Sequence, residues 1–306
     1  MESLPWVEKY RPSKFEDLIG NTEIIRTISL LIESENFPHF LFYGQAGTGK
    51  TSLILTCAKK LYGEAFSSMV LEMNASDNRG IEVVRNQIKS FASTKTLFNN
   101  RVKLIILDEA DQMTSTAQYA LRKMIEKYTS NVRFCLICNT ITNIIPALQS
   151  RCTKFRFLPI TNEQIKGRLQ TIIINEKIRI SNNALDTLIM TCKGDMRTCL
   201  NLLQSLSYTI ISEQLIYHNT ASLSPFDIEQ LILSTSHSFS EIYQYLIKLN
   251  KPIDNVIKSL TEQITLNNQE YLSILPKLAD LEYHYSSNHV SSYIGFGVLT
   301  SLLLSR

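Results

Sequence analysis

The residues best suited to chemistry lie in the segment GQAGTGKT at positions 44–51, which fits the pattern G-x-x-x-x-G-K-[ST]. Its glycines let backbone N–H groups turn toward phosphate oxygens, and Lys50 would reach the β- and γ-phosphates of a nucleoside triphosphate. Thr51 would place its hydroxyl on Mg²⁺, and the helix opened by Ser52 adds its positive N-terminal end. We therefore predict a nucleotide-binding loop; a glycine-rich turn that binds nothing is the alternative. The loop residues expected at the nucleotide are Gly44, Gln45, Ala46, Gly47, Thr48, Gly49, Lys50, Thr51 and Ser52.

Two neighbouring carboxylates follow a second apolar run. The segment VKLIILD ends in Asp108, and Glu109 comes directly after it. The carboxyl ends of the strands form the edge at which open parallel sheets bind ligands. There Asp108 would hold Mg²⁺, directly or through water, and Glu109 would polarise an attacking water, whereas an acidic pair in an ordinary loop would do neither. Asn139 ends the following strand and would hold that water by a hydrogen bond, unless it is only a turn residue.

Further cations elsewhere in the chain are candidates for phosphate contact. Arg151 in SRC and Arg197 in GDMR are candidates for the γ-phosphate, and spacing alone does not separate this interpretation from ordinary surface arginines. Arg85 and Lys89 stand four residues apart on one side of a predicted helix, and Arg79 lies in the polar loop before it. This basic side predicts either contact with a nucleic-acid backbone or a solvated helix face.

Alternating strands and helices must position these side chains. We predict strands at 40–43, 68–72, 102–108, 134–138 and 154–157, and helices at 21–33, 52–60, 81–91 and 117–128. The alternation implies right-handed βαβ crossovers, and hence an α/β fold in which helices cover both faces of a parallel sheet. The first 20 residues contain Pro5 and Pro12, which exclude a long regular element, so an ordered, extended arm is expected.

After Pro159 only helices are predicted. Thr161 followed by Gln164 indicates a capped helix, and further helices are expected at 184–192 and 196–210. A second boundary falls at 222–225. Five helices are expected beyond it, at 226–234, 239–249, 256–266, 271–285 and 293–304, with Pro276 kinking or splitting one of them. The predicted domains are thus a nucleotide-binding domain at 1–158, a small helical domain at 159–221 and an all-α domain at 222–306.

Composition narrows the class of protein. The 306 residues are 44% hydrophobic and 19% charged, as in ordinary globular proteins. Lys and Arg outnumber Asp and Glu within residues 1–158, whereas Asp and Glu outnumber Lys and Arg within residues 159–306. Any affinity for a polyanion is therefore expected mainly in residues 1–158. Cysteines in apolar segments favour a reducing compartment, and strand alternation turns Cys135 and Cys138 to opposite sides, against a metal site there. We expect no signal peptide, and the most apolar window, 294–304, is too short to span a bilayer.

Taken together, the motifs resemble the small subunits of eukaryotic replication factor C, which are clamp-loader ATPases of the AAA+ class. The resemblance rests on PWVEKYRP at 5–12, the loop at 44–51, NASDNRGIEVVR at 74–85, LIILDEAD at 104–111, Asn139, SRC at 150–152 and GDMR at 194–197. It is nearly continuous to about residue 205; beyond 222 it rests on helical character and length. It implies an AAA+ P-loop sheet domain, a helical lid and a helical collar for oligomerisation, at the three domain limits above.

The resemblance implies a role for each matching residue. Lys50, Thr51, Asp108 and Glu109 would be the Walker residues, Asn139 sensor 1 and Arg197 sensor 2. The adenine site would be lined by Val7, Arg11 and Ile19. Arg151 would be an arginine finger that acts on ATP bound to the neighbouring subunit. The template DNA backbone would be gripped by Arg79 and Arg85, with Lys89 as a helper.

The implied protein is a nuclear ATPase subunit of a heteropentameric clamp loader with one large and other small subunits. With ATP and Mg²⁺ it would open a ring-shaped sliding clamp and load it onto primer-template DNA in replication and repair. An alternative is an architectural subunit that binds ATP and lends Arg151 to its neighbour with little hydrolysis of its own, against which the retained Glu109 argues. Interpreting DEAD at 108–111 as an RNA helicase box would require a second RecA-like domain, which is not predicted. Two departures stand out: Gln45 and Ala46 replace prolines common in the family loop, and Asn143 stands where relatives often carry a basic residue.

Overall fold

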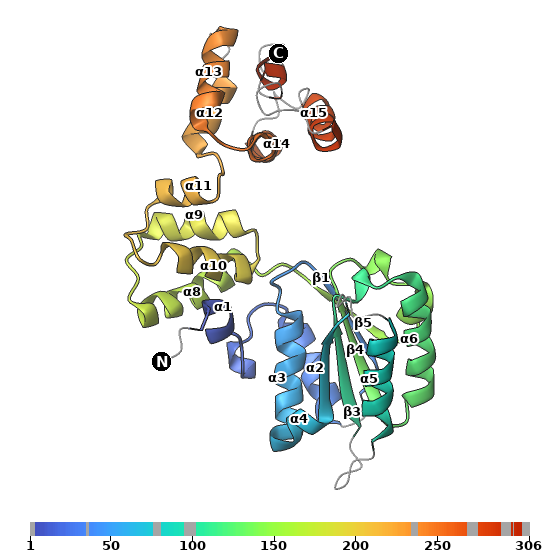
Figure 1. Ribbon diagram of the computed structural model, residues 1–306. Coiled ribbons are helices and arrows are strands. Elements are labelled where there is room, and N and C mark those ends of the chain that lie inside the picture. Colours follow the sequence, from blue (N-terminus) through green and yellow to red (C-terminus); the bar gives the residue numbers. More distant parts are fainter. Residues whose placement is uncertain are drawn as a thin grey trace. The chain divides into compact units, whose positions relative to one another are not determined.

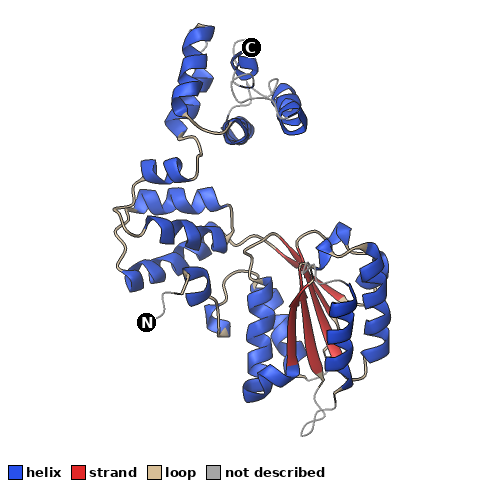
Figure 2. Ribbon diagram, viewed as in Figure 1, coloured by secondary structure: helices blue, strands red, loops and turns tan. Residues whose placement is uncertain are grey.

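The computed structural model describes residues 4–34, 37–75, 81–94, 102–233, 238–267, 275–288, 295 and 297–301. The chain forms two compact units, one of residues Met1–Arg179 and Leu188–Thr209, the other of Ile180–Thr187 and Ile210–Arg306. Figure 1 traces the elements in chain order, and Figure 2 shows that the strands all belong to the first unit. Each unit is described below by itself.

Five parallel strands form one sheet, in the order β2-β3-β4-β1-β5. Their bounds are β1 Phe40–Gly44, β2 Val70–Asn74, β3 Lys103–Asp108, β4 Val132–Cys138 and β5 Thr153–Phe157. Tyr43 pairs with Cys138 and Asn74 with Asp108, so the strands end close to a common edge. Because β3, β4 and β1 are adjacent, the segments that follow these three strands meet at that edge.

Helices cover both faces of the sheet (Figure 1). Their bounds are α2 Thr22–Glu33, α3 Lys50–Tyr62, α5 Ile81–Ser93 and α6 Ser115–Tyr128. Phe40 and Phe42 of β1 pack with α2 and α3 in one core. Leu41, on the other face of the same strand, packs with α5 and α6 in the second core. Cys135 belongs to the first core and Cys138 to the second, as strand alternation predicts. The predicted α/β sheet with two helical layers is confirmed.

Short elements complete the first part of the chain. They are α1 Trp6–Lys9, η1 Phe15–Asp17, η2 Gly63–Ala65, α4 Phe66–Met69, η3 Ala110–Gln112, η4 Ile141–Asn143 and α7 Pro146–Gln149. The arm is not wholly extended as predicted, because Pro5 takes the N-cap position of α1, where its missing N–H leaves no helical bond unmade. The second strand starts at Val70 rather than at residue 68, because α4 occupies the preceding turn.

Three helices follow β5: α8 Asn162–Glu176, α9 Asn182–Cys192 and α10 Met196–Leu206. The predicted capping box is present, since Thr161 accepts from the backbone N–H of Gln164 and the Gln164 side chain accepts from that of Thr161. Asp195 caps α10 by accepting from the backbone N–H groups of Arg197 and Thr198. That cap fixes where α10 begins, and with it the position of Arg197.

The described part of the second unit is helical. Its helices are α11 Glu213–Asn219, α12 Pro225–Leu233, α13 Phe239–Leu249, α14 Ile253–Asn267 and α15 Leu275–Asn288. Leu246, Leu260 and their neighbours form its apolar core. Pro276 is the second residue of α15, where proline fits the first turn. Residues 271–274, where the predicted helix begins, lie outside the described residues, so the kink or split expected at Pro276 stays a prediction. Half of the helix expected at 293–304 lies outside the described residues. Among the residues that the structure describes, no helix is long and apolar enough to cross a membrane.

Candidate active site

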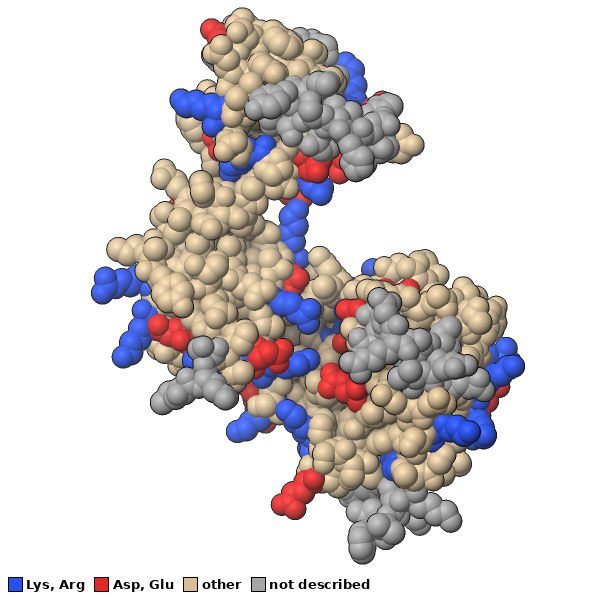
Figure 3. Space-filling model, viewed as in Figure 1, with Lys and Arg blue, Asp and Glu red and all other residues tan. Residues whose placement is uncertain are grey.

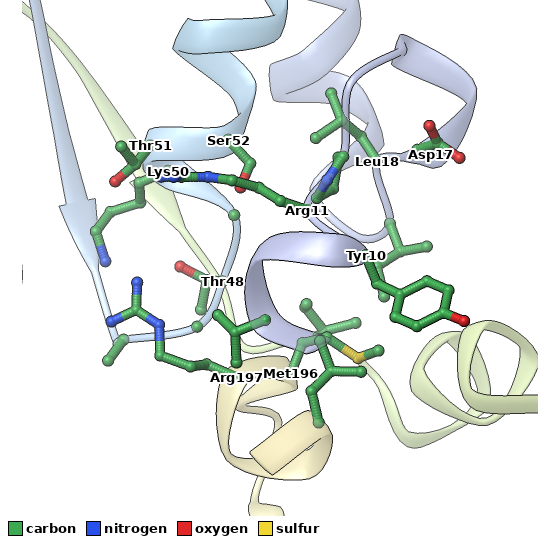
Figure 4. Close-up of a pocket in the computed structure, with 18 of the residues that line it drawn as sticks. Tyr10, Arg11, Asp17, Leu18, Thr48, Lys50, Thr51, Ser52, Met196 and Arg197 are labelled. Atoms are coloured by element: carbon green, nitrogen blue, oxygen red, sulfur yellow. The ribbon is translucent and has the colours of Figure 1, made fainter. Parts of the chain in front are cut away.

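A cavity of about 200 Å³ lies at the carboxyl edge of the sheet, within the first unit. Its walls come from the N-terminal arm, the loop before α3 with the first residues of that helix, the ends of β3 and β4, the start of α10, and Ile160 and Arg168 near and on α8. Figure 4 shows labelled side chains from the arm, from the loop and first turn of α3, and from the start of α10 around it. The predicted site residues in its lining are Val7, Arg11, Ile19, Ala46, Gly47, Thr48, Gly49, Lys50, Thr51, Ser52, Asp108, Glu109, Asn139 and Arg197.

Two glycines of the loop are required by contact as well as by conformation. Gly47 has φ +69°, and a Cβ there would lie 1.7 Å from Oδ1 of Asp195, the cap of α10. Gly44 has φ +144°, and a Cβ there would lie 2.2 Å from the carbonyl oxygen of Phe157. The loop therefore fits closely between β5 and α10, and only glycine allows this approach.

Lys50 is the buried cation of the site, with 7% of its surface exposed. Its Nζ donates to the carbonyl oxygens of Gly44 at 2.7 Å and Gln45 at 2.8 Å, and to Oδ1 of Asn139 at 3.2 Å. Gly44 and Gln45 thus serve the site through their backbone carbonyls. Burial lowers the pKa of the Lys50 ammonium; Asp108 works against that shift, and the nearby Arg197 adds to it. Figure 4 shows the Lys50 and Arg197 side chains directed to the same side of the loop, an arrangement that suits a polyanion such as a triphosphate.

Oxygen ligands for a magnesium ion lie beside this lysine. Thr51 Oγ1 donates to Asp108 Oδ2 at 2.7 Å, and the backbone N–H of Glu109 donates to Asp108 Oδ1 at 2.9 Å. Hydroxyl and carboxylate oxygens are the hard ligands that Mg²⁺ prefers, and it is commonly held by one or two carboxylates together with substrate phosphates. The residues present therefore fit the ion. Glu109 has φ +55°, an unusual value for this residue type, at the point where the chain leaves β3 for η3.

Asp111 holds Asn139 in place. One carboxylate oxygen, Oδ2, accepts from the backbone N–H groups of Asn139 at 3.1 Å and Thr140 at 3.0 Å. These bonds fix the turn that follows β4, from which the Asn139 amide reaches Lys50. The sequence analysis did not predict this positioning role. The only sequence feature that pointed to Asp111 was its place as the last residue of the DEAD segment at 108–111.

Gln118 of α6 is a second positioning residue that sequence reasoning missed. Its buried amide donates to the carbonyl oxygens of Met113 at 3.1 Å and Asn143 at 2.8 Å, and accepts from the N–H of Ile145 at 2.8 Å. It therefore holds the segment after β4 against α6. Nothing in its local sequence signals these contacts.

The cavity lining also contains residues that the sequence did not single out. Tyr10 and Met196 belong to the quoted motifs PWVEKYRP and GDMR, whereas Arg168 of α8 and Leu200 of α10 carry no sequence signal. Arg168 Nη1 forms an ion pair with Asp17 Oδ1 at 3.2 Å. The helices after β5 thus contribute part of the cavity wall.

Arg151 is not part of this chain's own cavity lining. It forms an ion pair with Glu126 of α6, and its Nη1 donates to the carbonyl oxygen of Ala147 at 2.9 Å. Arg122 Nε contacts the same Glu126 carboxylate at 3.2 Å, and these two arginines lower the pKa of Glu126. The structure therefore separates Arg151 from the other predicted phosphate-contacting residues.

The predicted DNA-binding residues are only partly described. Arg79 and the Arg85 side chain lie outside the described residues, and Lys89 is exposed on α5. On the face drawn in Figure 3, Lys and Arg side chains are interspersed with Asp and Glu over the described residues. The site geometry accordingly supports the nucleotide prediction more than the DNA prediction.

Comparison with known proteins gives the family. Residues 40–160 match the model of the ATPase family associated with various cellular activities, and residues 162–222 match that of the RFC1-like AAA+ ATPase lid domain. The Saccharomyces cerevisiae protein named replication factor C subunit 3 is 42% identical over 320 residues, spanning 99% of this chain and 94% of that protein. The chain belongs to the replication factor C subunit family. Human replication factor C subunit 5 is 44% identical over 94% of this chain and 87% of its own length. The probable replication factor C subunit 5 of Dictyostelium discoideum is 48% identical over 93% of this chain and 86% of its own length.

The family assignment confirms the predicted resemblance to a replication factor C small subunit, and the relatives just named agree with a particular likeness to the subunit called 3 in yeast and 5 in human. Membership in the AAA family supports ATP binding and P-loop ATPase activity. A solved structure of the Thermotoga maritima RuvB Holliday junction branch migration motor has a TM-score of 0.54 and 16% identity, over 86% of this chain and 88% of that chain. This likeness concerns the fold alone, and it agrees with the AAA+ architecture.

Proposed function

We propose that this chain is an ATPase subunit of a replication factor C-like clamp loader, which opens a ring-shaped sliding clamp and places it on primer-template DNA. The observation that carries the proposal is the pocket in which Lys50, the Thr51–Asp108 pair and Asn139 converge. Its relatives in the replication factor C subunit family support the choice of process.

We propose a role for each pocket residue, argued from its contacts where these are known and otherwise from the family resemblance. Lys50 would exchange the carbonyl oxygens it now contacts for phosphate oxygens, which relieves the burial of its charge. Thr51 and Asp108 would hold Mg²⁺, which when bound neutralises charge on the β- and γ-phosphates. Glu109 would take a proton from the attacking water, and Asn139 would orient that water. Arg197, at the start of α10, would face the γ-phosphate, and Val7, Arg11 and Ile19 would enclose the adenine.

Arg151 would serve the nucleotide of a neighbouring subunit. Its absence from the lining of its own pocket, within the part of the chain described, supports that role. A complete catalytic site would then need two subunits, as in a heteropentamer of large and small clamp-loader subunits. We also propose a nuclear location and the domain limits 1–158, 159–221 for the lid and 222–306 for the collar.

A Glu109→Gln variant in the assembled complex tests hydrolysis at this site. Glutamine is similar in size but is a far weaker base, so ATP binding should persist while DNA-stimulated turnover falls by the share that this site contributes. Lys50→Ala is the matched control, because it should remove ATP binding at the same site. Turnover equal to wild type in the Glu109→Gln complex would favour the architectural role, in which this chain binds ATP and lends Arg151 with little hydrolysis of its own.

A further inference from the structure

The N-terminal arm is attached to the helices that follow β5. The short helix α1 packs on α10, and Trp6 is buried there with 9% of its surface exposed. The backbone N–H of Trp6 donates to Gln204 Oε1 at 2.9 Å, and its ring meets that of Tyr10 edge-on, with centroids 6.4 Å apart. Only a little farther along the chain, Phe15 joins the core of the sheet domain. The arm therefore passes from the lid helices to the sheet domain along the wall of the pocket.

One carboxylate holds two consecutive arm residues. Glu176, the last residue of α8, accepts from Lys9 Nζ and from the Tyr10 hydroxyl through the same oxygen, Oε1. The Glu176 side chain is 19% exposed, whereas that of Lys9 is 49% exposed. Burial and the bond to Glu176 raise the pKa of Tyr10 to about 12, so this hydroxyl remains a donor at neutral pH. Figure 4 shows the Tyr10 ring at the edge of the pocket with its hydroxyl turned toward α8.

We propose that Glu176 is a positioning residue for the nucleotide: with Lys9 and Tyr10 it forms a latch that fastens the arm to α8 and so keeps Val7 and Arg11 in the pocket wall. We call these three residues the arm–lid latch. This inference rests on the proposed function only in that the cavity binds ATP. No motif contains Glu176, and it does not line the cavity itself.

The latch acts on affinity through the population of the docked arm. A nucleotide that contacts Val7 and Arg11 binds the docked form, so the apparent dissociation constant is the intrinsic one divided by the docked fraction. Breaking the latch lowers that fraction, and bound nucleotide restores it in proportion to its contacts with the arm. Arm docking and ATP affinity should therefore change together in latch variants.

The chain carries its own reporter of arm docking, because Trp6 is its single tryptophan. In the nucleotide-free full-length chain we expect Glu176→Gln to increase acrylamide quenching of Trp6 and shift its emission to the red. Saturating ATP should reverse most of this change. Calorimetric titration with ATP should give a dissociation constant about 3- to 10-fold weaker, the range for losing a part-exposed ion pair and weakening a charge-assisted hydrogen bond.

Tyr10→Phe is the second variant; it keeps the ring, removes the hydroxyl and should show a smaller change in the same direction. Glu33→Gln is the matched control, since it breaks the Lys60–Glu33 pair at 2.7 Å, whose residues do not line the cavity. Circular dichroism verifies folding of each variant. The proposal is overturned if Trp6 quenching and ATP affinity in Glu176→Gln and Tyr10→Phe equal those of Glu33→Gln.

A Lys50→Ala chain separates this outcome from failure of the proposed function. It should lose ATP binding while Trp6 quenching in the nucleotide-free chain stays at the wild-type value, because Lys50 does not contact the latch. Undiminished ATP binding by Lys50→Ala would refute the nucleotide site itself. If Trp6 quenching in Glu176→Gln and Tyr10→Phe still changed as expected, the latch would stand as the contact that docks the arm, even though the nucleotide site had been refuted.

Discussion

Replacing Gly47 by alanine tests how closely the nucleotide loop and α10 depend on each other. Gly47 has φ +69°, and the added Cβ would stand 1.7 Å from Oδ1 of Asp195 and 3.1 Å from its Cα. The Asp195 side chain caps α10 by accepting from the N–H groups of Arg197 at 2.8 Å and Thr198 at 3.2 Å. Rotation of that side chain alone does not relieve the contact, because the Cα is also close. Alanine should therefore displace the cap and the start of α10.

The magnitude follows from two separate effects. An alanine in the left-handed region costs roughly 1–2 kcal/mol. Loss of the Asp195 cap adds about 1 kcal/mol, so the total for Gly47→Ala is roughly 2–3 kcal/mol. Gly49 is the matched control: it has φ +89°, but a Cβ added there would meet nothing within 4 Å, so Gly49→Ala carries the first cost alone.

Urea unfolding of the nucleotide-free chain, followed by Trp6 fluorescence, measures this difference. The single tryptophan lies in the first unit, so the signal excludes unfolding of the second. We expect the free energy of unfolding to fall by about 1 kcal/mol more in Gly47→Ala than in Gly49→Ala, since only the former loses the cap. Hydrogen exchange at the amides of Arg197 and Thr198 should accelerate only in Gly47→Ala. Equal destabilisation and equal exchange in the two variants would refute the coupling between loop and cap.

Two further predictions concern acid stability and DNA. His39 is buried; its Nδ1 accepts from the Phe134 N–H at 3.1 Å and its Nε2 lies 3.3 Å from Thr129 Oγ1, while burial lowers its pKa from 6.5 to about 4. As the pH falls, the imidazole of His39 is protonated in the unfolded chain before it is protonated in the folded chain. The stability that neutral His39 provides is therefore complete above pH 6.5 and is lost as the pH falls to about 4, by up to roughly 3 kcal/mol. Urea unfolding across that range should show that the free energy of unfolding depends less steeply on pH in His39→Gln, and an unchanged dependence would contradict His39 as the cause. For DNA, reversing Arg79 and Arg85 to Glu in the assembled complex should weaken primer-template binding and flatten its dependence on salt, whereas wild-type affinity would exclude these arginines from the contact.

Local spacing was enough to predict which residues meet around Lys50 in the pocket. The glycines and Lys50 form a compact loop because hydrogen bonding and φ are set by residues a few positions apart. Asp108 and Asn139 end apolar strands, and in a parallel sheet strand ends meet at one edge, so periodicity and topology together placed them near Lys50. The capping box at Thr161 was predictable for the same reason, since its partners are three residues apart.

Tertiary structure alone decided which distant residues support that pocket. Glu176 meets Tyr10 across 166 positions, and the Asp195 cap meets Gly47 across a comparable stretch; no local pattern encodes either contact. Arg151 and Arg197 were equivalent candidates by residue type, and packing placed Arg197 in the pocket and Arg151 against Glu126 outside it. The physical reason is that a side chain's charge and hydrogen-bonding groups are known from its identity, whereas its partners are chosen by the packing of whole helices against the sheet.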